Sequence, residues 1–444
     1  MHRKARWATP VVALSLFALP GCGSDDAEGV AVGFCTIVDL GDGTAAIRCP
    51  DGSELVVRDG KDGADGQKGE PGEKGDKGDP GEKGEDAACT LDEVDGTFVL
   101  TCGDASVVLG DACADGFPYG LAFGSTDGAS TRNIVLFQAT SCTWVRGDVE
   151  VQRGVEELPP ALRRIEKIDG NFIVGTAGIE ELSLPRLIEI GSGFTLDSPE
   201  GLVNVDLPSL TRVGGVYLSG AGDLERVSFA SLATIDREIY IANNAKLSNL
   251  SFPLLETVGG WLQIFGGNQQ LTTVAFPSLK QADGILVSAA KELESMSFPA
   301  LETAGRMQLR ETGIVTLDGF PSLTAVADWL TIDNNENLKE VKDFIALERV
   351  GYLNIYGNEV LESVADFPAL EEINGGDGSD VIVYVANNLV LTSFGRLGSV
   401  STIDGGVTFS RNAELPQADI DALLDGIEIT GEVTLCGNKG GPAC

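Results

Sequence analysis

Residues 251–288 read SFPLLETVGGWLQIFGGNQQLTTVAFPSLKQADGILVS and contain the unit that decides the fold. An alternating apolar strand around Leu262 is followed by a turn, a second apolar segment ending in Phe276-Pro277-Ser278-Leu279, and a new alternating strand around Ile285. Alternation of apolar and polar residues favours a β-strand, because successive side chains point to opposite faces. The stretch therefore predicts a repeating unit that contains two short β-segments.

The same unit recurs from residue 149 to the end of the sequence. The first inward residue of each strand is expected at Val149, Phe172, Phe194, Val216, Ile239, Leu262, Ile285, Met307, Leu330, Leu353, Val383, Val407 and Val433. Successive positions are 22 to 24 residues apart, except for 30 before Val383 and 26 before Val433. So regular a period predicts the stacked coils of a solenoid.

A second column marks the turn of many coils. It consists of Asn244, Asn268, Asn335, Asn358, Asn388, Asn412 and Asn438. The backbone groups of a buried turn need hydrogen-bond partners, and a stacked amide supplies them in every coil. We expect these asparagines to be structural rather than ligand-binding.

The start of the repeat region resembles the opening of receptor L-domains, as in the insulin and epidermal growth factor receptors. The resemblance rests on residues 142–151, CTWVRGDVEV, in which a cysteine and Gly-Asp precede the first strand, and on later coils such as FPLLETVGG at 252–260. It covers residues 113–444 and implies a mainly β fold, a right-handed β-solenoid of leucine-rich-repeat character. It also implies a Cys113–Cys142 disulfide and a role in ligand binding or adhesion. A kinase and a Cys-rich furin-like region are absent from the sequence, so receptor signalling does not carry over.

The N-terminus resembles a bacterial lipoprotein signal peptide. Basic residues 1–7 precede a mostly apolar segment, 8–19, and Leu19-Pro20-Gly21-Cys22 resembles a lipobox. The apolar segment is shorter than the ~20 residues of a membrane-spanning helix and suits a signal-peptide core. We expect residues 1–21 to be removed, Cys22 to carry the lipid that anchors the chain in the membrane, and residues 22–34 to form a flexible tether. The expected location is the outer membrane, at the cell surface; ordinary signal cleavage near Gly21 is the alternative.

Eight further cysteines, an even number, indicate disulfides in an exported chain. Pairing of neighbours gives Cys35–Cys49, Cys89–Cys102, Cys113–Cys142 and Cys436–Cys444, although the sequence permits other pairings. The first two disulfides would hold small β-hairpins with Asp-Gly turns, in residues 35–59 and 87–112. The last two would cap the ends of the solenoid, residues 113–444.

Between the two hairpin modules, residues 60–86 form a run of G-x-y triplets, with glycine at 60, 63, 66, 69, 72, 75, 78, 81 and 84. Only glycine fits the axis of a collagen triple helix. The segment is similar to bacterial collagen-like stalks and predicts a homotrimer. An extended single-chain linker is the alternative.

Composition excludes several functions. The chain has 31 Lys plus Arg against 67 Asp plus Glu, a net charge of −36, so nucleic acid is not expected as a partner. The one histidine, His2, lies in the expected signal peptide, which excludes histidine-based triads and imidazole metal sites from the mature chain. We expect no enzymatic activity, no cofactor and no metal, and we interpret the Gly- and Asp-rich residues around Asp377 as a loop insertion.

The candidate ligand site lies at outward positions beside the inward column. These positions hold Tyr217, Tyr240, Trp261, Gln263, Arg306, Gln308, Trp329, Tyr352, Asn354 and Tyr384. Binding surfaces favour Tyr, Trp and Arg, and Trp261 and Trp329, three coils apart, would be separated by roughly 14 Å. The predicted function is a surface lipoprotein that presents a protein- or glycan-binding solenoid on a stalk. A purely structural envelope protein without a ligand is the alternative, because aromatic residues also suit strands and cross-strand pairs.

Overall fold

The computed structural model describes the backbone of six strands within residues 36–110 and the residues 116–123, 134, 137–138, 142–153, 155–175, 178–375 and 381–444. Several predictions fall outside these described residues and stay predictions. They concern the signal peptide 1–21, Cys22, the tether 22–34, the collagen-like segment 60–86, and the side chains of Cys35, Cys49, Cys89, Cys102 and Cys113.

Two small sheets are formed within residues 36–110. The first is antiparallel, with the order β1 (Thr36–Gly41), β2 (Thr44–Arg48) and β3 (Glu54–Arg58). The second has the order β4 (Cys89–Val94), β5 (Thr97–Cys102) and β6 (Ala105–Gly110). Each sheet thus has one strand more than the hairpin predicted from the sequence, and both added strands are rich in β-branched valine.

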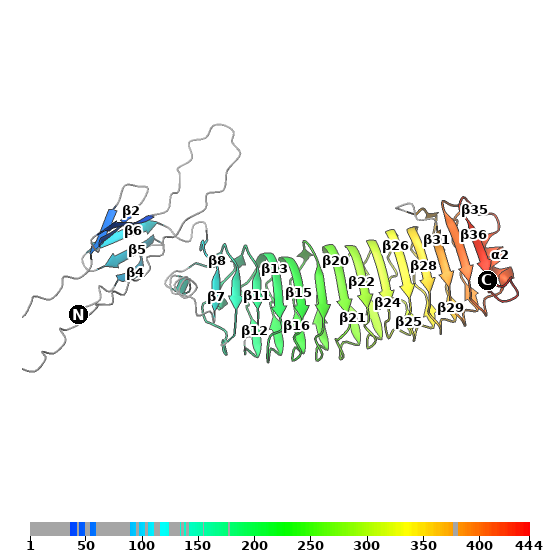
Figure 1. Ribbon diagram of the computed structural model, residues 1–444, viewed down its shortest axis with the longest axis horizontal. Coiled ribbons are helices and arrows are strands. Elements are labelled where there is room, and N and C mark those ends of the chain that lie inside the picture. The colour runs from blue at the N-terminus through cyan, green and yellow to red at the C-terminus, as the bar shows by residue number, and fades with distance from the viewer. Residues whose placement is uncertain are drawn as a thin grey trace, which may run out of the picture. The chain divides into compact units, whose positions relative to one another are not determined.

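The repeat region forms a parallel β-solenoid whose main wall is a 20-stranded sheet, called the long sheet below (Figure 1). Its principal strands are β7 (Leu121–Phe123), β9 (Val149–Val151), β11 (Phe172–Val174), β13 (Glu189–Asp197), β15 (Arg212–Ser219), β18 (Ile239–Ala242), β20 (Thr257–Phe265), β22 (Gln281–Ser288), β24 (Thr303–Arg310), β26 (Ala325–Asp333), β28 (Arg349–Tyr356), β31 (Val381–Ala386), β34 (Gly406–Ser410) and β36 (Val433–Cys436). Shorter strands before a corner complete it: β8 (Trp144–Val145), β10 (Lys167–Ile168), β17 (Thr234–Ile235), β30 (Glu372–Ile373), β33 (Thr402–Ile403) and β35 (Glu428–Ile429).

The register of the long sheet confirms the predicted repeat. Phe172 pairs with Val149 on one side and with Phe194 on the other. The predicted inward residues remain opposite one another through every following coil, ending with Val407 and Val433. One coil was not predicted. It contains β7, which precedes the first predicted strand and places Leu121 opposite Val149.

The second apolar segment of each repeat forms smaller parallel sheets at the lower edge of the coils in Figure 1. These sheets contain β12 (Glu181–Ser183), β14 (Asn204–Asp206), β16 (Arg226–Ser228) and β19 (Asn249–Ser251); β21 (Thr273–Ala275) and β23 (Ser295–Ser297); and β25 (Thr316–Leu317), β27 (Glu340–Val341), β29 (Ser363–Val364) and β32 (Ser393–Phe394).

A column of stacked phenylalanine rings fills the interior of the coils. Its members are Phe229, Phe252, Phe276, Phe298, Phe320, Phe344 and Phe367, all buried. Neighbouring ring centroids lie 5.1 to 6.0 Å apart, with interplanar angles of 10 to 26°. Such contacts add to the free energy gained from burying the rings. The Phe-Pro-x-Leu motif is therefore a core motif.

The asparagine column forms a hydrogen-bonded ladder, as the sequence predicts. In a typical link, the backbone N–H and the side-chain amide of Asn335 both donate to Oδ1 of Asn358, each at 3.0 Å. The Asn335 amide also donates to the backbone carbonyl of Leu309 in the preceding coil, at 3.0 Å. The residue before each rung has a positive φ, as in Asn334 (54°) and Gly357 (67°), and this turns the chain out of the strand.

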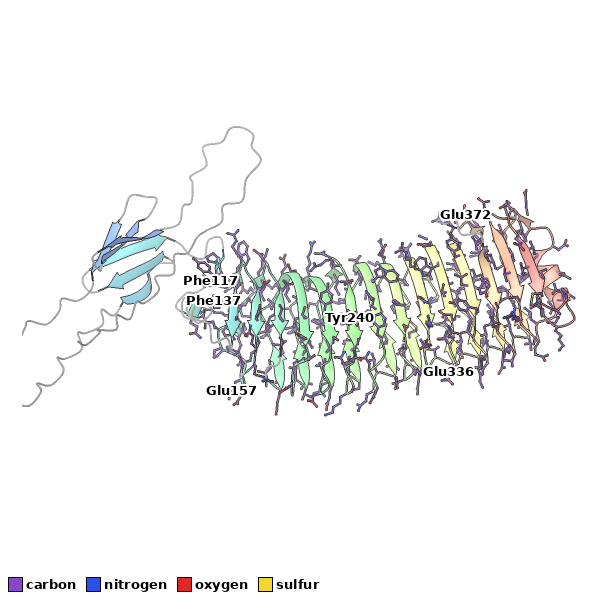
Figure 2. The ribbon with its side chains drawn as sticks, viewed as in Figure 1. Phe117, Phe137, Glu157, Tyr240, Glu336 and Glu372 are labelled. Atoms are coloured by element: carbon purple, nitrogen blue, oxygen red, sulfur yellow. A yellow bond between two sulfur atoms is a disulfide. The ribbon has the colours of Figure 1, made fainter. Side chains whose placement is uncertain are left out.

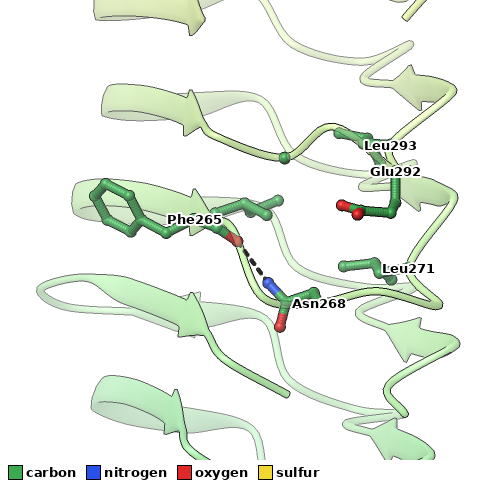
Figure 3. A pocket seen from close by; sticks show the side chains of 7 residues that line it. Phe265, Asn268, Leu271, Glu292 and Leu293 are labelled. Carbon is green, nitrogen blue, oxygen red and sulfur yellow. Dashed lines mark hydrogen bonds between the residues drawn. The ribbon is translucent and has the colours of Figure 1, made fainter. Parts of the chain in front are cut away.

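The ladder is interrupted where Ala290 occupies the position of an asparagine. Here the Asn268 amide donates to the carbonyl of Phe265 in its own coil, at 2.7 Å (Figure 3). A cavity of ≈10 Å³ lies beside this turn and is lined by Asn268, Leu271, Ala290 and Leu293 among others, a volume about equal to that needed for one water molecule.

The two ends of the solenoid differ. At the N-terminal end, Phe117 and Phe137 are buried with ring centroids 5.2 Å apart, and the guanidinium carbon of Arg164, in the 3-10 helix η1 (Leu162–Arg164), lies 4.5 Å from the Phe137 centroid. Cys142 is disulfide-bonded to a cysteine whose side chain lies outside the described residues.

At the C-terminal end, the last coils contain α2 (Gln417–Leu424) and the predicted Cys436–Cys444 disulfide. Val433 was expected to be inward and buried, but it is 44% exposed because β36 is the last strand of the sheet. No helix among the described residues is long and apolar enough to cross a membrane.

Candidate functional site

The ten candidate residues occupy two adjacent columns on the outer face of the long sheet. One column contains Trp261, Arg306, Trp329 and Tyr352, with Gly284 opposite Trp261. The other contains Tyr217, Tyr240, Gln263, Gln308, Asn354 and Tyr384. Figure 2 shows Tyr240 in the middle of the solenoid. All ten thus lie where the period-2 alternation predicts, but they differ in their surroundings.

The centre of the face is a cluster of two indoles and one guanidinium. The Arg306 guanidinium carbon lies 5.8 Å from the ring centroid of Trp261 and 4.8 Å from that of Trp329. Both distances are within the range of cation–π attraction. Arg306 thereby links two rings that are three coils apart, and all three side chains remain partly exposed.

Trp261 lies across Gly284 of the next coil. A Cβ atom at Gly284 would be 2.4 Å from Cε3 and 2.6 Å from Cδ2 of the indole, closer than van der Waals contact allows. Glycine at this position therefore leaves the space in which the ring rests against the backbone.

Asp328 fixes the orientation of Arg306. The Nε–H of Arg306 donates to Oδ2 of Asp328 at 2.8 Å. The other carboxylate oxygen, Oδ1, is buried and has no hydrogen-bond partner among the residues that the structure describes. Asp328 was not predicted from the sequence, because it lies two residues before the inward Leu330, just before the alternating part of the strand.

Tyr217 and Tyr240 are engaged within the protein. The ring of Tyr217 rests over Gly215, and its hydroxyl donates to Oε1 of Glu238 at 2.8 Å. Burial, followed by the Glu238 carboxylate, raises the pKa of Tyr217 above its ordinary value. Tyr240 packs against Phe265, with ring centroids 5.4 Å apart. These rings therefore contribute to the packing of the face.

A buried carboxylate organises the polar side chains near Tyr384. The Asp333 side chain is 0% exposed and accepts hydrogen bonds from Gln308 (3.0 Å) and Asn334 (2.7 Å). Burial, followed by the Asp333 charge, raises the pKa of Tyr356, whose ring contacts Tyr384 edge to face at 5.6 Å. Asp333 and Tyr356 were not predicted from the sequence, because both lie one residue beyond the four alternating positions that define each strand.

Two candidate residues, Tyr352 and Asn354, are less accessible to a ligand than predicted. Tyr352 was expected to be exposed but is 5% exposed, because its ring lies beside Gly375, where a Cβ atom would come within 3.3 Å of the ring. The Asn354 amide donates to the Thr331 hydroxyl at 3.2 Å. By contrast, Gln263 has no side-chain hydrogen bond within the described part of the chain.

No group of three or more His, Cys, Asp or Glu side chains is placed to hold a metal ion within the described ranges. The acidic hollow of the N-terminal coils, lined by Glu156, Glu157, Glu180, Glu181 and Arg163 among others, contains none of the ten candidate residues. The arrangement on the long sheet can thus stack against a ligand and hydrogen-bond with it.

The fold and this face define the chain as a β-solenoid repeat protein with aromatic side chains on its long sheet. It is similar to Protein ecm33 of Aspergillus fumigatus, with 28% identity over 190 residues, which is 42% of this chain and 46% of the fungal protein. The match therefore spans less than half of that relative. No protein-family model and no solved structure matches the chain.

Proposed function

We propose that the chain is a non-enzymatic surface lipoprotein that displays its solenoid as a binding module for a protein or glycan. The observation that carries this proposal is the partly exposed cluster of Trp261, Arg306 and Trp329 on the long sheet. Exposed aromatic rings gain little from contact with water, whereas binding surfaces are enriched in tryptophan and arginine.

The rest of the proposal concerns architecture and location. The parallel coils and the capped N-terminal end support a solenoid of the receptor L-domain type, wound with the right-handed sense that the resemblance implies. The Leu19-Pro20-Gly21-Cys22 segment supports lipid anchoring through Cys22 in the outer membrane, and residues 60–86 support a collagen-like stalk. Cys22→Ser is expected to release the chain from membranes, as measured by fractionation of cells; retention in the membrane fraction would contradict the anchor.

The binding function is tested with the biotinylated full-length chain in detergent. The probes are intact cells that lack the protein, peptidoglycan sacculi and extracellular polysaccharide, all from the organism that produces the chain. We expect retention on at least one probe, and loss of it in the double variant Trp261→Ser/Trp329→Ser with an unchanged circular dichroism spectrum. Tyr352 is not included, because its burial makes a substitution destabilising. Equal retention of the variant would place the binding site elsewhere on the chain, whereas no retention of either protein would favour the second candidate.

The second candidate is a purely structural envelope protein. It is favoured by the intramolecular contacts of Tyr217, Tyr240 and Tyr384, which show that aromatic side chains on this face also stabilise the sheet. Cross-strand aromatic pairs commonly contribute in this way. In this case the wild-type chain would be retained on none of the probes, and the double tryptophan variant would lower the stability of the solenoid.

A further inference from the structure

We propose that the Trp261–Arg306–Trp329 cluster binds an uncharged polysaccharide, whose sugar rings stack on the two indoles. The proposal rests on the proposed function, because it names the ligand class for the same face. It is carried by the way the rings lie, by their separation and by the side chains around them.

The ring of Trp261 is positioned for stacking. The indole rests against Gly284, the Arg306 guanidinium carbon lies 5.8 Å from the ring centroid, and the residue is partly exposed. The face of an aromatic ring carries a negative potential, and the C–H groups of a pyranose ring carry a small positive one. A sugar ring can therefore lie flat on this indole without any rearrangement of the sheet.

Trp329, the second ring of the cluster, is held in place by its contact with Arg306. Arg306 lies between the two indoles, and Asp328 fixes its guanidinium through a 2.8 Å hydrogen bond. Rings that are ordered before binding lose little conformational entropy when a ligand arrives. The cluster is thus preorganised, unlike two independent exposed tryptophans.

The separation of the indoles indicates an extended ligand. The Arg306 guanidinium carbon lies 5.8 Å from one ring centroid and 4.8 Å from the other, so the two centroids are at most 10.6 Å apart, closer than the roughly 14 Å between the strands that carry them. A single sugar unit is too short to contact both rings. An oligosaccharide that runs along the axis of the solenoid can contact both at once.

The surroundings favour a saccharide over a protein. A stable protein interface buries about 800 Å² on each side, with an apolar centre. Between and beside these indoles lie Gly284, Arg306 and the amides of Gln263 and Gln308. The large exposed hydrophobic side chains of the described solenoid, such as Ile188, Leu254 and Ile345, are all outside these two columns.

Charge selects among the saccharides. The chain has a net charge of −36, so its field repels polyanions. Amide side chains, such as that of the partly exposed Gln263, pair well with sugar hydroxyls and require no charge on the ligand. An uncharged polysaccharide therefore matches this face better than a uronic acid or sulfated polymer.

The test measures binding of defined oligosaccharides to the full-length chain in detergent by calorimetry. The probes are the hexamers and dimers of cellulose, chitin, laminarin and mannan, with hexagalacturonate as the charged comparison. We expect at least one uncharged hexamer to bind, and to bind at least tenfold more tightly than its dimer. Trp261→Ala and Trp329→Ala should each weaken that binding at least tenfold, and hexagalacturonate should not bind.

A pair of glycine variants provides a matched control. In Gly284→Ala the new methyl group occupies the place of the Trp261 ring, so the ring must move and hexamer binding should fall at least tenfold. In Gly222→Ala the new methyl group meets no atom within 4 Å, so binding should be unchanged. Circular dichroism and the urea midpoint of each variant separate loss of the site from loss of the fold.

Other outcomes would overturn the assignment. Hexamer binding that survives both tryptophan variants would place the saccharide site elsewhere while leaving the proposed binding function intact. Failure of every hexamer to bind, combined with tryptophan-dependent retention on protease-sensitive cell-surface material, would replace the saccharide with a protein ligand. The absence of binding to every oligosaccharide and to every cell-surface probe would overturn this proposal and the proposed function together.

Discussion

A single asparagine illustrates how much of the turn geometry depends on one side chain. Oδ1 of Asn358 accepts two hydrogen bonds from Asn335, and its amide donates to the Ile332 carbonyl at 2.9 Å. Asn358 is 0% exposed, so water cannot replace these bonds. Each buried polar group left without a partner costs about 1–3 kcal/mol.

Asn358→Ala is therefore expected to lower the free energy of unfolding by about 3 kcal/mol, which is the loss of two to three such groups with partial relaxation. Urea denaturation followed by circular dichroism measures this change. Asn354→Ala on the outer face removes one hydrogen bond from a partly exposed residue and should lower it by less than ~1 kcal/mol. Equal effects of the two variants would contradict the structural role of the ladder.

Two tyrosines make the stability of the solenoid depend on pH. Burial raises the pKa of Tyr217 and of Tyr356 above the ordinary value of about 10. The folded chain thus retains phenol protons that the unfolded chain releases. Their contribution to stability is fully present below about pH 10 and is lost as the pH rises through the folded-state pKa.

We expect absorbance at 295 nm to show a late phase of tyrosine ionisation above pH 10. Tyr217→Phe and Tyr356→Phe should each remove part of that phase and reduce the fall in unfolding free energy over the same pH range. An unchanged late phase in both variants would assign it to other groups.

At the scale of elements, the phenylalanine column joins the coils through the core. Phe298 is 0% exposed, and its ring lies 5.3 Å from those of Phe276 and Phe320. Phe298→Ala leaves a cavity between two coils and should lower the free energy of unfolding by about 3–5 kcal/mol. Phe265→Ala, which removes a partly exposed ring from the outer face, should lower it by less than half as much. Chemical denaturation of the two variants in parallel makes the comparison.

The strand register was predictable from the sequence because the period-2 alternation and the 22- to 24-residue spacing repeat in nearly every coil. The orientation of side chains on the outer face was not predictable in this way. The alternation of apolar and polar residues predicts that Trp261 and Tyr352 point outward. It does not predict that the Trp261 ring rests against Gly284, or that the chain at Gly375 covers Tyr352. Those outcomes depend on neighbours from other coils and on one insertion.

At the two ends of the solenoid, two predictions from the sequence were wrong, and each has a physical cause. The coil at β7 was missed because Leu121 lies 28 residues before Val149, outside the usual spacing. Val433 has the sequence context of an inward residue, but a side chain is buried only when another coil or a cap lies beyond it.

At the scale of the whole molecule, the triplets at residues 60–86 predict a trimer. The chain from residue 23 onward should sediment as a trimer at low temperature, and Gly72→Ala combined with Gly75→Ala should convert it to a monomer, because each methyl group crowds the triple-helix axis. Analytical ultracentrifugation at several temperatures tests this. A monomer under all conditions would favour the linker interpretation and would leave the solenoid unaffected.

The interrupted ladder at Ala290 is expected to make this joint of the described solenoid mechanically weaker than its neighbours. Asn268 is the last rung of one hydrogen-bonded series, and Thr312 begins the next by donating to Asn335. Between these two residues, no asparagine side chain links the turns of neighbouring coils, because the Asn268 amide donates within its own coil (Figure 3). If the protein is pulled along its axis, as a surface protein is when cells are sheared apart, this joint should open first. The solenoid would then extend in two steps, and the coils that carry Trp261 would separate from those that carry Trp329.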